Sequence, residues 1–184
     1  MLISYLLVLW GNMIFYYPGI FLTCVSLYLT SIMDQFNAKI ISTQGKMTKP
    51  SYWKSIREDY GCITNIIRSL DDLMGYLTLS TILNNIFFVC FQLYSIFSEP
   101  YQRNIYTVCS TLLMLLQLLT LVFFTSEVNT TSRAATAFLY KVTSTDFCTE
   151  VQRLIDQSHN DEVALSGLKF FYVTREFALS VSIL

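Results

Sequence analysis

The chain has 184 residues, of which 53% are hydrophobic and only 14% are Asp, Glu, Lys or Arg, and its formal net charge is −1. A soluble domain usually carries about 25% charged residues, so this composition disfavours a soluble all-α protein. The near-neutral charge, without a basic or acidic tail, gives no support for nucleic-acid binding.

Three runs contain no charged residue, namely 1–33, 73–98 and 104–126. Each run exceeds the ~20 apolar residues that cross ~30 Å of hydrocarbon. We therefore predict an all-α, polytopic transmembrane helical bundle with spans at residues 1–33, 73–98 and 105–126. Residues 177–184 begin a further span, and we expect the chain to end inside it, because eight residues cannot cross a bilayer.

The first span contains two interruptions, at Gly11-Asn12 and at Pro18-Gly19. Pro18 is poorly placed for an uninterrupted helix. Residues 1–10 then form either the end of a preceding helix or an outer extension of the first membrane helix. The chain start lacks a basic region and a small-residue cleavage site, which argues against a signal peptide.

Residues 34–72 form the first long polar segment. Ser42–Pro50 is a polar loop signal. After it, apolar residues recur at helical spacing, at Ile56, Tyr60, Ile63, Ile67 and Leu70. This spacing predicts an amphipathic helix that continues into the second span. At the start of that span, Asp71-Asp72 would complement the positive N-terminus of a helix.

Residues 127–176 form the second long polar segment, for which we predict several helices. Ala134–Tyr140 is apolar and helical in pattern, and Ser144-Thr145-Asp146 resembles an N-cap. The helix after this cap would have one apolar stripe, formed by Phe147, Val151, Leu154 and Ile155. Asp156–Glu162 predicts a polar turn, and a further helix is expected from Val163.

The placement of Lys and Arg predicts the orientation. Six lie between residues 39 and 68, five between residues 133 and 175, and only Arg103 lies in the link 99–104. Cytoplasmic loops next to membrane spans are enriched in Lys and Arg. We therefore predict that both polar segments are cytoplasmic, that the link is extracellular, and that a glycan at the acceptor Asn129 would overturn this orientation.

Chemistry-bearing motifs give no sign of an enzyme, a metal or a cofactor. The five cysteines are scattered without a CxxC pair, which predicts neither a disulfide framework nor a zinc site. His159 is the one histidine, and it has no second ligand at metal spacing.

Three ordered stretches carry a resemblance to a known family. Residues 163–181 read VALSGLKFFYVTREFALSV and fit the pattern LSGLxFFxxTRxxxLS. That pattern is met by Leu165, Ser166, Gly167, Leu168, Phe170, Phe171, Thr174, Arg175, Leu179 and Ser180. Residues 51–94 contain Tyr52-Trp53, Arg57-Glu58, Tyr60, Leu70-Asp71-Asp72, Asn84-Asn85 and Cys90-Phe91-Gln92-Leu93, and residues 132–163 contain a Cys-x-Glu-Val element. Together the stretches resemble the C-terminal part of insect gustatory receptors of the sugar-taste branch.

The resemblance implies a subunit of a tetrameric, ligand-gated cation channel in the plasma membrane that serves taste perception. Spans four, five and six would be residues 1–33, 73–98 and 105–126, and residues 127–176 would contribute to a cytoplasmic anchor. The family's pore helix carries a Thr-Tyr…Gln-Phe signature that this chain lacks, so we expect a fragment. The implied partners are a sugar, the lipid bilayer and identical or related subunits, with no cofactor.

Polar and aromatic side chains in the charge-free runs are candidates for a sugar pocket, because sugar hydroxyls need amide partners and aromatic faces suit C–H surfaces. The predicted ligand-binding residues are Trp10, Asn12, Tyr16, Tyr17, Gln92 and Tyr94. An interfacial aromatic belt is the alternative for the tyrosines and Trp10. For Asn84, Asn85, Gln92 and Gln117 the alternative is hydrogen bonding between helices, which we favour for the two asparagines.

Arg175 and Glu176 stand where the last polar segment meets the last apolar run. We predict an anchor or gating contact for them, with ordinary interfacial anchoring as the alternative. Two other protein classes remain open, a membrane transporter fragment and a different multi-span receptor. A transporter would favour paired Gly/Pro-broken helices, of which only Pro18-Gly19 gives a hint.

Overall fold

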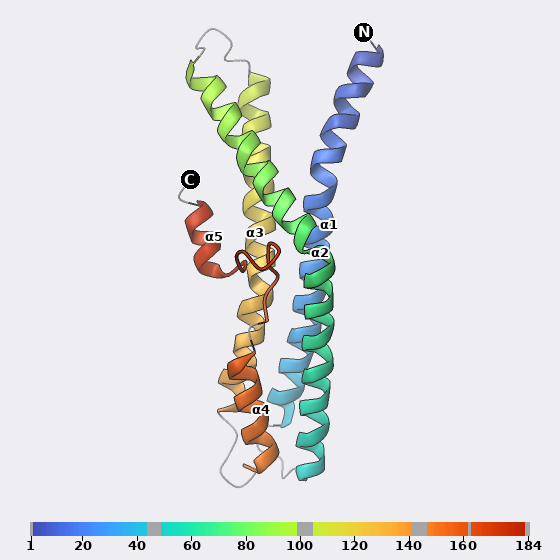
Figure 1. Cartoon of the computed structure of the whole chain (residues 1–184), viewed down its shortest axis with the longest axis vertical. Coiled ribbons are helices and arrows are strands. Elements are labelled where there is room, and N and C mark those ends of the chain that lie inside the picture. Colours follow the sequence, from blue (N-terminus) through green and yellow to red (C-terminus); the bar gives the residue numbers. More distant parts are fainter. Residues whose placement is uncertain (1, 44–48, 99–104, 141–146, 162, 183–184) are drawn as a thin grey trace.

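The computed structural model consists of long helices. It describes residues 2–43, 49–98, 105–140, 147–161 and 163–182, with the backbone alone for residues 2–15, 106, 107 and 182. Over these residues it forms α1 (Leu2–Thr43), α2 (Pro50–Ser98), α3 (Ile105–Leu139), α4 (Thr149–Asn160) and α5 (Arg175–Ser182), and no strand (Figure 1). The all-α prediction is confirmed.

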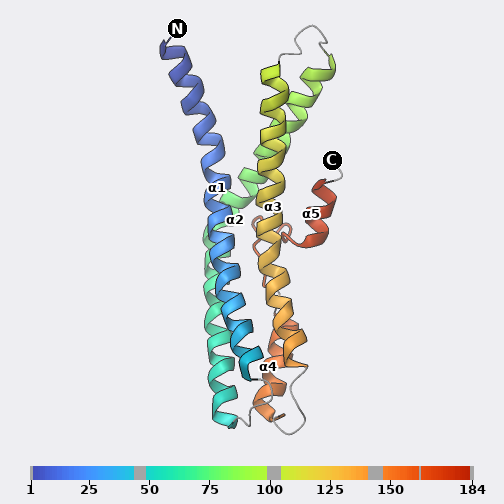
Figure 2. The same cartoon turned by 180° about the vertical axis from the view of Figure 1, so that it is seen from behind.

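The three long helices exceed the thickness of a bilayer. α2 has 49 residues, which corresponds to roughly 73 Å at 1.5 Å per residue, against ~30 Å of hydrocarbon. In the described residues, α1 from Tyr16 onward, α2, and α3 from Val108 onward are long and apolar enough to cross a membrane. The long helices run alongside one another at the end where α4 packs, and α1 diverges from α2 and α3 toward the N-terminus (Figures 1 and 2).

One half of the molecule, which we call the charged bundle, comprises residues 29–43, 50–70, 128–140 and 147–165. Its core contains several side chains with no exposed surface, including Met33, Ile40, Ile56, Val128, Val151 and Leu154. Ion pairs lie on the surface of the charged bundle. They join Lys39 to Asp59 at 2.6 Å, Arg57 to Glu150 at 2.9 Å, and Arg68 to Asp161 at 2.7 Å. The charged bundle therefore has the apolar interior and ionic surface of a protein in water.

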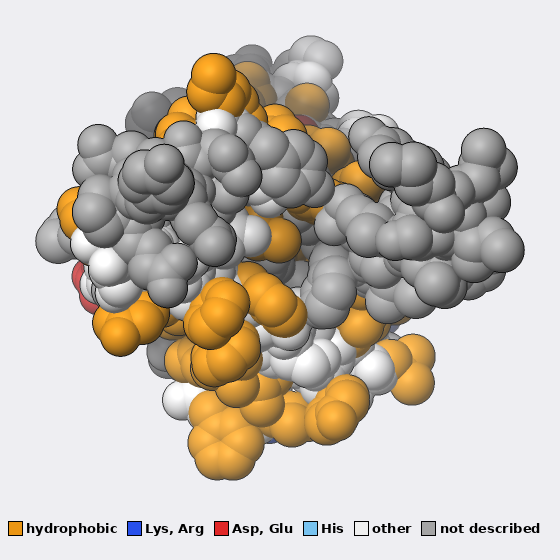
Figure 3. Space-filling model, turned by 90° about the horizontal axis from the view of Figure 1, so that it is seen from above, with side chains coloured by type: hydrophobic (Ala, Val, Ile, Leu, Met, Phe, Trp, Pro, Cys, Tyr) orange, Lys and Arg blue, Asp and Glu red, His pale blue; other side chains and the backbone are white. Residues whose placement is uncertain are grey.

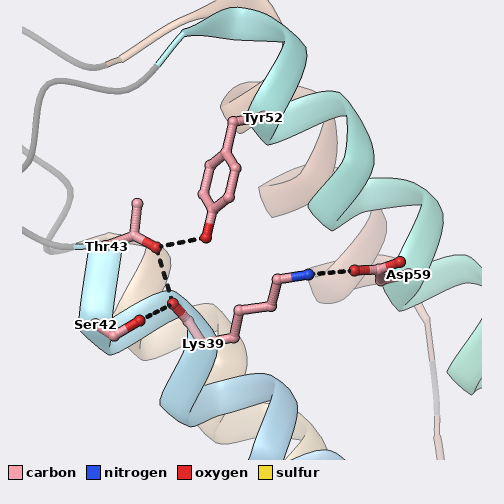
Figure 4. A network of polar contacts seen from close by, with 5 residues as sticks. All are labelled: Lys39, Ser42, Thr43, Tyr52 and Asp59. Atoms are coloured by element: carbon pink, nitrogen blue, oxygen red, sulfur yellow. Dashed lines mark hydrogen bonds and ion pairs between the residues drawn. The ribbon is translucent and has the colours of Figure 1, made fainter.

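The α1–α2 connection is fixed by a small polar network (Figure 4). Lys39 Nζ donates to Asp59, and the hydroxyls of Thr43 and Tyr52 lie 3.0 Å apart. Thr43 Oγ1 and Ser42 Oγ both donate to the Lys39 carbonyl, at 2.8 and 2.9 Å. These bonds tie three side chains near the end of α1 to the first turns of α2 and to one another.

The other half, which we call the apolar half, comprises residues 2–28, 71–98, 105–127 and 166–182. Many large hydrophobic side chains on its surface are exposed, including Tyr17, Phe21, Leu83, Phe87, Phe91, Phe97, Leu113, Leu116 and Phe123. Seen from the end where α1 begins, the described side chains are mostly hydrophobic (Figure 3). An exposed apolar surface of this extent is stable in lipid and not in water.

Several sequence-based boundaries need correction. Pro18 lies inside an uninterrupted α1, so residues 2–10 extend the first membrane helix and are not a separate one. Membrane helices tolerate proline where neighbouring groups satisfy the freed backbone. The expected separate helix at 134–140 is the end of α3, held there because Ala135 and Leu139 are buried in the core of the charged bundle.

The expected turn at 156–162 is also wrong in part, since α4 continues to Asn160. The predicted cap Ser144-Thr145-Asp146 lies outside the described residues, and Cys148 occupies the N-cap position of α4. No helix begins at Val163, because the chain turns back on itself after Ser166 and the next helix begins at Arg175. The predicted stripe is confirmed for Val151, Leu154 and Ile155, which are buried, whereas Phe147 is exposed.

Candidate functional site

A cavity of about 330 Å³ lies between α1 and α3 in the apolar half. It is lined by Tyr16, Gly19, Ile20, Thr23, Cys24, Gln117 and Thr120. Gln117 Nε2 donates to the Tyr16 carbonyl at 3.3 Å, in the turn of α1 that precedes Pro18. The cavity thus brings an amide, hydroxyl groups and a tyrosine together where the surroundings are otherwise apolar.

Gly19 makes room for the amide of Gln117. A Cβ atom at position 19 would lie 2.6 Å from Gln117 Nε2, closer than real contacts allow. Thr23 Oγ1 donates to the Gly19 carbonyl at 2.8 Å, so its hydroxyl is bonded within α1. Gly19 therefore lines the cavity, and the pair Pro18-Gly19, which the sequence marks as an interruption, lies within a continuous helix.

The structure does not bring all the predicted sugar-binding residues together. Tyr16 lines the α1–α3 cavity, whereas Tyr17 is 71% exposed and stacks on Phe21. Gln92 accepts a hydrogen bond from Thr111 of α3 at 2.8 Å, and Tyr94 is 70% exposed.

Trp10 and Asn12 belong to the part of α1 described by its backbone alone, so their side chains lie outside the described residues. The sequence marks Gln117 as a polar residue in an apolar run, but no local pattern places it beside Tyr16, 101 positions earlier in the chain.

The two asparagines of α2 were expected to bond between helices. Asn85 is buried, and its Nδ2 donates to the Thr81 carbonyl one turn earlier in α2. This bond lies within α2 and does not join it to another helix. Polar contacts between helices are instead made by Gln92 with Thr111 and by Ser26 with Thr125, whose hydroxyls lie 3.3 Å apart.

Arg175 and Glu176 form the first turn of α5. Arg175 lies 3.4 Å from Glu127 of α3, and both its side chain and that of Glu176 are exposed. The Arg175–Glu127 contact joins α5 to α3 near the boundary between the charged bundle and the apolar half. Exposed pairs of this kind stabilise a fold by about 0–1 kcal/mol, so this contact adds little to the attachment of α5 to α3.

Asp71 does not complement a helix N-terminus, because α2 begins at Pro50 and Asp71 lies in its interior. The carboxylate is 7% exposed and accepts bonds from the backbone and hydroxyl of Ser166. The burial of the Asp71 carboxylate is therefore explained by its hydrogen bonds to Ser166, which lies 95 residues further along the chain.

Three titratable groups with shifted pKa values belong to the charged bundle, and a fourth, Lys169, lies in the loop before α5, where the bond to Asp72 raises its pKa. Burial raises the pKa of Tyr60 to about 12. The guanidinium of Arg57 lowers the pKa of Glu150, and the bond to Asp59 raises the pKa of Lys39. These shifts follow from burial and from ion pairs, and among the described residues no three of His, Cys, Asp and Glu lie together as a metal site.

Asn129, the predicted glycosylation acceptor, is buried in α3. Its Nδ2 donates to the Val163 carbonyl at 3.1 Å. The amide nitrogen that would carry a glycan is thus inside the charged bundle, so the lack of a glycan there would not test the orientation.

These features define a class of protein. Three helices that can cross a bilayer, an apolar half with exposed large side chains, and a charged bundle at one end together describe a multi-pass membrane protein.

Comparison with known proteins gives the family. The model of the trehalose receptor family matches residues 2–183, and the chain belongs to that family of insect sugar-taste receptors. The gustatory receptor for sugar taste 64f of Drosophila melanogaster is 32% identical over 185 residues, which cover 96% of this chain and 39% of the relative. The gustatory receptor 5a for trehalose of the same species is 30% identical over 168 residues, which cover 90% and 38%.

The chain spans about two fifths of the length of these relatives. The relatives are named as receptors and not as enzymes, in agreement with the lack of catalytic motifs in the sequence.

Proposed function

We propose that this chain is part of a plasma-membrane receptor for sugars that acts as a ligand-gated cation channel subunit. The observation that carries the proposal is the family match over residues 2–183. A tetramer of identical or related subunits is the assembly that the resemblance implies. The chain spans only part of the length of its relatives, so the proposed activity is that of the whole receptor. Within that receptor, this chain would supply several membrane helices and the charged bundle.

The proposed orientation places the charged bundle in the cytoplasm and the link 99–104 outside. The Lys and Arg count supports this orientation, because eleven of the twelve lie in residues 39–68 and 133–175. The separation of an ion-paired bundle from an apolar half supports a boundary near Asp71, Glu127 and Arg175.

We propose the α1–α3 cavity as a sugar contact. Its volume of about 330 Å³ lies at the lower end of the roughly 300–1,000 Å³ that is typical of small-molecule pockets. Gln117 can offer its amide oxygen and Tyr16 an aromatic face, the two groups that sugars require. Trp10 and Asn12 precede Tyr16 on α1, and we retain them as further candidates, as we do Tyr17, Gln92 and Tyr94.

The proposed mechanism is a population shift. A sugar that binds the open state more tightly than the closed state moves the equilibrium toward the open state by the difference in binding free energy. Contacts between α1 and α3 would carry that difference, because the cavity lies between these two helices. The charged bundle would keep its structure in both states and hold the subunits together.

A chimera tests the proposal. Residues 2–183 replace the matching segment of the Drosophila 64f receptor, and sugar-evoked currents are recorded in cells that express it at the surface. Gln117→Leu should raise the half-maximal sugar concentration about tenfold, the effect of losing one buried polar contact. The matched variant Asn85→Leu, which loses an amide bonded to the Thr81 carbonyl within α2, should change it by less than about threefold.

A surface-expressed chimera without any sugar-evoked current would contradict the receptor proposal. A tenfold effect of Gln92→Leu with none for Gln117→Leu would move the sugar contact to the α2–α3 interface.

A further inference from the structure

The segment between α4 and α5 is a compact loop that turns back on itself. Val173 N donates to the Leu165 carbonyl at 2.9 Å, and Gly167 N donates to the Phe171 carbonyl at 3.0 Å. At the tip, Leu168 and Lys169 have φ angles of 53° and 62°. Two consecutive left-handed residues with side chains are unfavourable, so contacts elsewhere must hold the loop in this shape.

Asp71 of α2 supplies the main contact. Ser166 N donates to Asp71 Oδ1 at 2.5 Å, and Ser166 Oγ donates to Oδ2 at 2.9 Å. Ser166 Oγ in turn accepts a bond from Lys169 N at 3.1 Å, which ties the strained tip to the same carboxylate. Both oxygens of a buried carboxylate are thus used, and hydrogen bonds to an ionised acceptor are about twice as strong as neutral ones.

Gly75, one turn further along α2, allows the loop to come this close. A Cβ atom at position 75 would lie 3.1 Å from Leu168 N and 3.4 Å from Leu168 Cα. Glycine is otherwise a poor residue for a helix interior. On the outside, Lys169 Nζ lies 2.8 Å from Asp72, in a pair of which both side chains are mostly exposed.

The loop also joins the two cores of the protein. Val163 and Leu165 belong to the core of the charged bundle, whereas Val173 belongs to the core of the apolar half. Phe171 stacks on Phe177 of α5 with ring centroids 4.8 Å apart. Any displacement of the loop would therefore be passed to the start of α5.

We propose that residues 165–173, held by Asp71 and seated on Gly75, form a releasable clasp that sets the position of α5 relative to α2. In the clasped state the carboxylate of Asp71 offsets the strain at Leu168 and Lys169. In the released state these two residues relax and α5 moves freely with respect to α2. Asp71 acts here as a positioning residue, and the inference does not rest on the proposed channel activity.

The test uses the chain in lipid nanodiscs with two spin labels. Cys62, which is exposed on α2, carries one label, and Ser180→Cys on α5 carries the other, with the remaining four cysteines replaced. Pulsed electron paramagnetic resonance measures the distribution of distances between the labels. Hydrogen exchange at the Ser166 amide, measured by mass spectrometry, reports the clasp itself.

The parent chain should give one narrow distance distribution. Asp71→Ala should broaden it and should accelerate exchange at Ser166 at least about tenfold, because a bond to a charged acceptor is lost. Gly75→Ala should broaden it as well, although it leaves every hydrogen-bonding group in place, and so keeps the test valid if Asp71→Ala does not fold. Asp72→Asn, which removes only the exposed pair with Lys169, is the matched control and should leave both readouts unchanged.

A fourth variant separates a clasp from a passive contact. Lys169→Gly relieves a left-handed residue and should slow exchange at Ser166 while leaving the distance narrow. The inference is overturned if a folded Asp71→Ala or Gly75→Ala chain keeps the parent distribution, or if Asp72→Asn broadens it equally.

Discussion

Replacing Tyr60 by phenylalanine should stabilise the protein. The side chain is 1% exposed in the core of the charged bundle, and within the described structure its hydroxyl has no hydrogen-bond partner. A buried hydroxyl without a partner costs about 1–3 kcal/mol. Tyr60→Phe removes that cost and keeps the ring packed against Phe36, whose centroid lies 5.5 Å away. We expect a gain of about 1 kcal/mol in the free energy of unfolding.

Tyr52→Phe is the matched control, because the same atom is removed from a hydroxyl that lies 3.0 Å from Thr43 Oγ1. It should lower stability by about 0.5–1.5 kcal/mol, the net worth of one hydrogen bond. Titration from mild detergent into SDS, followed by circular dichroism, measures both. A loss of stability in Tyr60→Phe equal to that in Tyr52→Phe would refute the reasoning, since it would mean that the Tyr60 hydroxyl is bonded.

The pH dependence of the free energy of unfolding gives a second test of the environment of Tyr60. Burial raises the pKa of Tyr60 to about 12 from an ordinary value of about 10. As pH rises, the Tyr60 hydroxyl therefore loses its proton in the unfolded chain before it does so in the folded chain. This ionisation leaves the free energy of unfolding unchanged below about pH 10 and lowers it between about pH 10 and pH 12. The parent chain should lose stability over that range, and Tyr60→Phe should lose less.

Three further predictions concern the charged bundle. Because Arg57 lowers the pKa of Glu150, this carboxylate contributes stability above its unfolded pKa of about 4.5, and that contribution disappears as pH falls through the lower folded value. Glu150→Gln should reduce the change in α4 hydrogen exchange between pH 5 and pH 3, and an unaltered change would contradict the pairing. Ile56→Ala should destabilise by about 2–5 kcal/mol because Ile56 is fully buried, whereas Ile66→Ala, at a 44% exposed position, should cost under about 1 kcal/mol in the same unfolding assay. Asn129 should carry no glycan in either orientation, since its amide is buried, and a mobility shift after glycosidase treatment would show that α3 is not packed as described.

The sequence predicts those parts of the fold that depend on local pattern. Ile56, Tyr60 and Ile67 repeat at helical spacing and are buried as expected. The lengths of the charge-free runs likewise predict the three long helices, because composition alone determines which segments suit lipid. Helix ends were predicted less well, since α3 is extended by burial of Leu139 against other elements, which local pattern does not report.

Contacts between distant residues were beyond reach of the sequence. Asp71 and Ser166 are 95 positions apart, and Gln117 meets Tyr16 across 101 positions. The left-handed conformations of Leu168 and Lys169 had no signal either, because neither residue type favours positive φ. The loop was consequently predicted as a helix, from apolar spacing alone.

The central proposal is that the apolar half lies in lipid, except for the charged residues where it meets the charged bundle, and that the charged bundle lies in the cytoplasm. Cys62 and Cys90 are both exposed in the structure, one in each half, so their labelling reports the solvent around them. In cells expressing single-cysteine variants, a membrane-impermeant maleimide should label Cys62 only after permeabilisation and should not label Cys90 in either condition. Labelling of Cys62 on intact cells would reverse the orientation, and ready labelling of Cys90 would contradict a lipid-facing surface.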